Sequence, residues 1–191
     1  DAGSWRATLA SSVANLAAGD YVYLASTQVY STDASTTFGQ LALVNYVSND
    51  GLTVDLADGV FLPYSTAFSA TIRRVLFNVG TTLENVAILG NSTGLTTEVV
   101  QGIVAQRTRN LLLTNVSVSD VYSTGISIQT SWNARVQNSY VVNATTAGTA
   151  YGVSISNACS FVKVANCHFE NVRHGITSGA GSVGGINYMI E

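Results

Sequence analysis

Few acidic side chains are available for acid–base chemistry in the second half of this 191-residue sequence. Three of them, Glu98, Asp120 and Glu170, are candidate catalytic residues. Two carboxyl groups at a suitable separation can divide the roles of proton donor and base, or proton donor and nucleophile, in the hydrolysis of a glycosidic bond. Two of the three also have a plainer interpretation: Asp120 fits a structural bend, and Glu98 fits a solvated loop.

No metal site or cofactor is expected. Cys159, Cys167, His168 and His174 lie close together in the sequence. On a strand, however, Cys167 and His168 would point to opposite faces and could not share a zinc ion. The arginines are not accompanied by an acidic cluster that would hold calcium. We interpret the two histidines as surface residues and Cys167 as a small core residue.

Aromatic and basic side chains suggest a binding surface instead. Trp132 precedes an aligned Asn, which indicates exposure, and Arg135 follows three residues later. Tyr122 falls in an outward or loop position by the same alignment. Exposed rings can stack on sugars, so Trp132, Tyr122 and Arg135 are candidate carbohydrate-binding residues. A subunit contact, or a Trp that only packs against a loop, is the alternative.

Repeated glycines and asparagines mark the elements that must position these residues. Gly102, Gly125, Gly152 and Gly175 each precede a short alternating apolar segment, at steps of 23, 27 and 23 residues. An Asn follows the first three glycines after 13, 13 and 14 residues, and a second column follows five residues later. The two columns are Asn115, Asn138 and Asn166, and Asp120, Asn143 and Asn171.

This repeat predicts a coil of short period-2 strands whose turns stack into one core, a parallel β-helix. Asn at equivalent bends tolerates the left-handed conformation, and its amides can bond from turn to turn. The 27-residue step places residues 144–150 in a loop. Glu170 then lies two turns beyond Asp120, with backbones about 10 Å apart. That separation excludes a retaining pair and leaves an inverting pair marginal.

The N-terminal third of the sequence has a different pattern from the repeat. Asp50-Gly51 between two alternating apolar runs predicts a hairpin, so residues 1–75 are expected to form a small antiparallel unit. Residues 5–17 fit a helix or a strand, and we favour a strand. Residues 76–191 are expected to form the β-helix, which we expect to continue beyond the last residue because residues 184–188 start another turn.

Together these segments resemble a known group. Residues 83–190 look like the pectate-lyase-like right-handed parallel β-helix superfamily. The segments 19–24, 49–56 and 83–88 are similar to those that lead into the β-helix of bacteriophage tailspikes and tail fibres. The resemblance implies an all-β fold and a homotrimer that recognises bacterial surface polysaccharide and in many cases cleaves it. No lyase motif matches residue by residue.

Composition excludes several other classes. The formal net charge is −3, and the only Lys is Lys163, so nucleic acid is not an expected partner. The apolar runs are too short to span a bilayer. Charged residues make up 10% of the chain, which disfavours long exposed helices.

We therefore predict a segment of a virion tailspike or tail fibre, located on the phage tail and extracellular. Its expected partners are bacterial surface polysaccharide, two further copies of the chain and other virion tail proteins. Whether it also depolymerises the glycan stays open, by hydrolysis or by elimination. A secreted monomeric carbohydrate-active enzyme and a cell-surface adhesin stalk are the alternatives.

Overall fold

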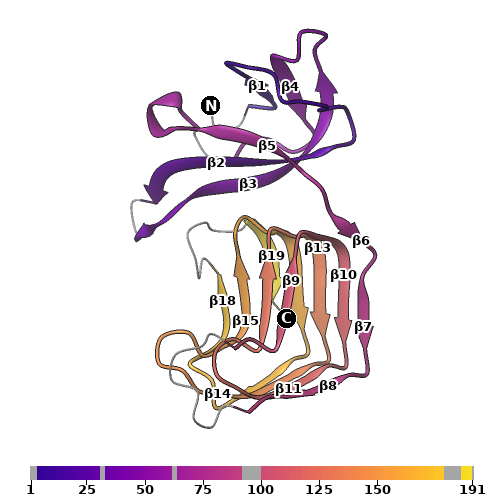
Figure 1. The fold of residues 1–191 in the computed structure, drawn as a ribbon, viewed down its shortest axis with the longest axis vertical. Coiled ribbons are helices and arrows are strands. Elements are labelled where there is room, and N and C mark those ends of the chain that lie inside the picture. The colour runs from indigo at the N-terminus through magenta and orange to yellow at the C-terminus, as the bar shows by residue number, and fades with distance from the viewer. Residues whose placement is uncertain (1–3, 31–32, 62–63, 92–99, 179–185, 191) are drawn as a thin grey trace.

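The computed structural model describes residues 4–30, 33–61, 64–91, 100–178 and 186–190, with only the backbone described for residues 30, 33–36 and 186–190. The strands form an antiparallel sheet at the N-terminus and then a coil of parallel strands, the solenoid (Figure 1). Within the described ranges there is no α-helix, and one short 3₁₀ helix, η1, spans Thr66–Phe68. The predicted all-β fold, a right-handed parallel β-helix after an antiparallel unit, is confirmed.

The N-terminal sheet has the strand order β1-β4-β3-β2-β5. These strands are β1 (Arg6–Thr8), β2 (Tyr21–Tyr30), β3 (Asp33–Val47), β4 (Thr53–Leu56) and β5 (Thr71–Val75). The predicted hairpin turn joins β3 to β4: the Gly51 N–H donates to the Ser48 carbonyl over 2.8 Å. Gly51 has a φ of +70°, which explains why glycine stands there.

A small separate core lies under this sheet and includes Val22, Val44 and Val54. Leu9 and Leu16 pack against it from the segment before β2. The strand expected over residues 5–17 is therefore only partly present, because β1 covers Arg6–Thr8 and the rest is irregular. The Leu9 N–H still donates to the Leu52 carbonyl over 2.8 Å, but the residues after Leu9 form no strand, so apolar spacing overstated the strand.

The solenoid is built from three parallel sheets, and successive turns add strands to each sheet. Sheet I contains β6 (Asn78–Val79), β7 (Thr82–Glu84), β10 (Thr108–Thr114), β13 (Trp132–Gln137), β16 (Ser160–Ala165) and β19 (Ile186–Ile190). Sheet II contains β8 (Ala87–Leu89), β11 (Ser117–Val121), β14 (Tyr140–Ala144) and β17 (His168–Glu170). Sheet III contains β9 (Ile103–Gln106), β12 (Ile126–Gln129), β15 (Tyr151–Ser156) and β18 (His174–Ser178).

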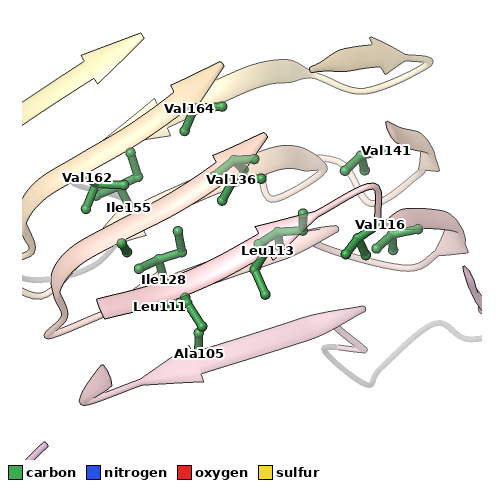
Figure 2. Packing of buried hydrophobic residues seen from close by; sticks show 14 of the residues in the cluster. Ala105, Leu111, Leu113, Val116, Ile128, Val136, Val141, Ile155, Val162 and Val164 are labelled. Atoms are coloured by element: carbon green, nitrogen blue, oxygen red, sulfur yellow. The ribbon is translucent and has the colours of Figure 1, made fainter. Parts of the chain in front are cut away.

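Like side chains stack on like along the solenoid interior. Leu113 pairs with Val136 and Val136 with Val164, and all three are about 1% exposed or less. Ile128 and Ile155 face them from sheet III (Figure 2). A single turn could not bury these side chains, so each turn depends on its neighbours for its core.

The repeated glycines lie where sheet III begins, against the side chains of sheet II. A Cβ on Gly125 would overlap the Val141 side chain and come within 3.0 Å of the Gly152 carbonyl. A Cβ on Gly152 would overlap the Phe169 ring and the Gly175 carbonyl. The glycine repeat is therefore a packing requirement, since the next turn passes too close for a side chain.

The asparagine columns occupy left-handed bends, as expected, and the bonds expected along the solenoid are present in part. Asn143 has a φ of +58°. Its Nδ2 donates to Asp120 Oδ1 over 2.9 Å, and its Oδ1 accepts from Asn171 Nδ2 over 2.9 Å. In the other predicted column, Asn115 Nδ2 donates to Asn85 Oδ1 over 2.6 Å. These ladders satisfy amide groups that a tight bend would otherwise leave unpaired.

In the part of the chain that the structure describes, no helix is long and apolar enough to cross a bilayer.

Candidate functional site

The candidate catalytic acids do not converge in the described structure. Asp120 and Glu170 both belong to sheet II, but β14 lies between their strands, which separates the backbones by about 10 Å. Asp120 accepts the ladder bond from Asn143, and exposed Glu170 lies 3.6 Å from the His168 imidazole. Glu98 lies outside the described residues. Each described acid thus has a structural or surface contact of its own.

The histidines and cysteines are also dispersed. His168 and His174 are exposed, and the His174 ring stacks on Tyr151 with centroids 5.7 Å apart. Cys159 is fully buried, which raises the pKa of its thiol to about 11. Within the described ranges, no three His, Cys, Asp or Glu side chains form a group that could hold a metal ion.

The three candidate binding residues divide between two places. Trp132 and Arg135 lie on strand β13, which follows the C-terminal end of β12. Tyr122 lies before the N-terminal end of β12. The four residues of β12 alone separate the two places by about 13 Å. Trp132 and Tyr122 are half-buried, and Arg135 is exposed. Only Trp132 and Arg135 can therefore contribute to one compact surface.

Trp132 lies in the middle of a row of aromatic rings that joins the N-terminal sheet to the solenoid. Its ring contacts Tyr21 of β2, with centroids 5.0 Å apart, and Phe161 of β16 at 4.7 Å. The Phe77 ring also contacts Tyr21, with centroids 5.2 Å apart. The Arg109 guanidinium lies 5.3 Å from the centre of the Tyr21 ring, within cation–π range. All three ring contacts are edge-to-face, the favourable geometry for aromatic pairs.

Phe161 is not among the candidate residues predicted from the sequence. Its φ is +55°, and by strand register it continues a third bend column after Asn110 and Asn133. Asn133 Nδ2 donates to Asn110 Oδ1 over 2.8 Å, so the ladder runs up to Phe161 and is interrupted there. A left-handed conformation costs an ordinary residue roughly 1–2 kcal/mol. Counting five residues back from each of Asn115, Asn138 and Asn166 finds this column.

Arg135 and Lys163 are register partners on neighbouring strands of sheet I. Both alternate with buried core residues of their strands, so they project to the outer face of the sheet. Arg135 is exposed and Lys163 is half-buried. The outer face next to the aromatic row therefore carries two cations on adjacent turns, about 4.8 Å apart along the solenoid.

The outer side of sheet III is not an open polar surface. Alternation places Ser127, Ser154 and Ser156 on the side away from the core, but they are only 2–5% exposed. Gln129 Nε2 donates to Ser127 Oγ over 2.9 Å, so part of this side is bonded internally. Period-2 alternation predicts the side to which a residue points, but not what covers that side.

Two clefts of the described structure are lined by residues other than Asp120 and Glu170. The larger, about 810 Å³, lies in the N-terminal unit between residues 4–14 and strand β5. The smaller, about 490 Å³, lies beside the predicted loop at 144–150, and Arg173 contributes to its wall. Arg173 Nη1 donates to the Gly148 carbonyl over 2.5 Å, which fixes the loop to the next turn.

A comparison with protein families gives the same fold as the stacked parallel sheets and their columns of bends. The model of the family described as right handed beta helix region matches residues 49–188, more than half of the chain. The chain belongs to the right-handed β-helix family. The match includes β4 and β5 of the N-terminal sheet as well as the described turns of the solenoid.

Two solved structures of phage tailspikes resemble this β-helix chain. Tailspike protein gp49 from Pseudomonas phage LKA1 has 25% sequence identity and a TM-score of 0.66, and the alignment covers 87% of this chain. Tailspike gp61 from Pseudomonas phage phi297 has 19% identity and a TM-score of 0.73 over 99% of this chain, a likeness of fold alone. This chain corresponds to 27% and 31% of the lengths of those two proteins. A search of the curated proteins found no match.

Proposed function

We propose that this right-handed β-helix chain is part of a phage tailspike that binds bacterial surface polysaccharide during host attachment. The observation that carries the proposal is the likeness to the LKA1 tailspike, which spans both the N-terminal sheet and the solenoid at 25% identity. In this proposal residues 1–75 form an N-terminal unit that precedes the β-helix of residues 76–191. The protein then acts extracellularly on the virion tail, as a homotrimer joined to other tail proteins.

Trp132 and Arg135 are the proposed polysaccharide-binding residues. They lie three residues apart on β13, and Arg135 is exposed. A ring beside a guanidinium can stack on a sugar and donate to its oxygens. Tyr122 is a separate candidate contact at the other end of β12. Binding is favoured over cleavage, because Asp120 is held in the ladder and Glu170 lies two strands away.

Binding of the fluorescently labelled chain to bacterial cells tests this function. We expect it to label some strains in a panel of Pseudomonas with different surface polysaccharides, and not their polysaccharide-deficient mutants. Labelling that survives loss of the polysaccharide would contradict the proposal. Light scattering on the natural full-length protein is expected to give three times the chain mass, to which these 191 residues contribute 20.0 kDa per copy. A monomer would favour the secreted enzyme, for which release of reducing ends is the next measurement.

A further inference from the structure

The charges of the solenoid are sorted by sheet. In the described strands, sheet I carries Arg109, Arg135 and Lys163 against one acid, Glu84. Sheet II carries Asp120 and Glu170 and no Lys or Arg, and sheet III carries neither acids nor Lys or Arg. Three of the eight basic residues of a chain with net charge −3 are thus gathered on one sheet. Such a local excess of positive charge favours an anionic ligand.

The cations of sheet I lie beside the aromatic row. Arg109 and Trp132 are register partners, and Arg135 follows on the same strand as Trp132. Arg135 and Lys163 are register partners in turn. Glu84, the one acid in the described strands of sheet I, is on the first described turn and is two strands from β13. Trp132 and Arg135 on β13, and Phe161 and Lys163 on β16, therefore lie on neighbouring strands of sheet I, and the Trp132 and Phe161 rings are in contact.

Phe161 is not required by the fold at its position. The two preceding turns place Asn at the equivalent bend, where the amides bond to one another. Phe161 adopts the same left-handed conformation without an amide, and its side chain is 40% exposed. Conformational strain of this kind tends to persist where the side chain has a function. Its ring widens the aromatic surface of Trp132 by one turn.

We infer that this part of sheet I binds an acidic polysaccharide, with Trp132 and Phe161 stacking on a sugar ring while Arg135 and Lys163 hold carboxylates. The inference rests on the proposed function and names the class of glycan. A guanidinium binds a carboxylate through two parallel hydrogen bonds, and the lysine ammonium adds a compact charge. The apolar face of a sugar ring packs on an aromatic ring. Phe161 is the binding residue added by this inference.

An array of immobilised bacterial capsular and O-antigen polysaccharides tests the class of ligand. The array contains uronic-acid-containing and neutral polymers, and the labelled 191-residue chain is applied at low and high ionic strength. We expect binding to acidic polymers only, weakened at high salt because exposed charge pairs are screened. The strongest ligand is then reduced at its carboxyl groups, and we expect the neutral polymer to lose binding.

Variants of the chain test the residues. R135Q combined with K163Q is expected to weaken binding at least about tenfold, the effect of losing a charged hydrogen bond. F161N is expected to weaken binding about fivefold without lowering the unfolding midpoint, and F161Y to bind like the original chain. Two controls remove similar groups elsewhere. Y140S removes an exposed ring of sheet II, and R73Q removes an exposed cation of the N-terminal sheet. Both should leave binding unchanged.

Each other outcome contradicts a defined part of the inference. Equal binding to neutral polymers, or unchanged binding after carboxyl reduction, overturns the acidic class while the proposed function stands. If F161N binds as strongly as the original chain, Phe161 is not part of the binding site. Absence of binding to every polymer overturns both the inference and the proposed function.

Discussion

In the N-terminal sheet the Arg6 guanidinium donates two hydrogen bonds to the Asp55 carboxylate, over 2.6 and 2.8 Å. Arg74 forms an ion pair with Asp20 at 2.9 Å. In the solenoid the corresponding cross-strand contacts are made by amides, as in the ladder from Asp120 through Asn143. An ion pair can form wherever two flexible side chains meet. An amide ladder needs identical bends stacked in register, so it exists only where the backbone repeats. The difference predicts that single substitutions are costlier in the solenoid.

The largest effect is expected at the glycine column. In G152A the new Cβ must displace the Phe169 ring and the Gly175 carbonyl, and overpacking of this kind costs about 3 kcal/mol. The control G148A has a φ of +95° but open space around it, so it pays only the conformational cost of about 1 kcal/mol. Chemical denaturation of both variants measures the two costs. Equal losses would mean that close packing does not explain the column.

A smaller effect is expected in the ladder. N143A loses both amide bonds and places alanine in a left-handed bend, so the free energy of unfolding should fall by about 2 kcal/mol. N143G loses the same bonds but accepts the bend, which limits the loss to about 1 kcal/mol. Urea midpoints distinguish the two. If N143G is as unstable as N143A, the bend is not strained for alanine.

The interrupted column should respond in the opposite direction. F161N relieves the strain of the bend and lets the new amide donate to Asn133 Oδ1, gains that offset the lost contact with Trp132. The free energy of unfolding should therefore stay the same or rise, by up to about 1 kcal/mol. F161A loses the ring without gaining the amide and should be less stable than F161N. Thermal unfolding of the pair checks the order.

The smallest effect is expected at the exposed ion pair of the N-terminal sheet. The hydrogen bond from Arg6 lowers the pKa of Asp55 below its usual value. A lowered folded-state pKa stabilises the fold above the unfolded pKa of about 4, and this contribution disappears as the pH falls through the folded value. D55N should therefore lose less stability than the original chain between about pH 5 and pH 3. Identical acid profiles would show that the pair contributes nothing. The Ser48 hydroxyl lowers the pKa of Asp50 in the same way. Asp50 is present in both proteins, so its titration does not contribute to the difference between their acid profiles.

The sequence predicted the features of this fold that repeat. Gly125 and Gly152 marked the start of sheet III, and Asn138 and Asn143 marked bends at the end of sheet I and within sheet II, because every turn meets the same steric demand. The site is harder to predict, because its residues differ from turn to turn. Phe161 has no amide, so residue type alone does not assign it to the column of Asn110 and Asn133. The contact of Trp132 with Tyr21 joins positions 111 residues apart, which no local pattern predicts.

The ladder that starts at Asp120 has a direction, and the direction limits how such a solenoid can grow. A carboxylate only accepts, so Asp120 can begin a ladder, whereas Asn143 both donates to the turn before and accepts from the turn after. Duplicating the turn that carries Asn143 would add one more amide that bonds on both sides. Duplicating the turn that carries Asp120 would place two carboxylates on adjacent strands with no proton between them. Lengthening by gene duplication is therefore expected to copy asparagine turns and to leave the aspartate turn single.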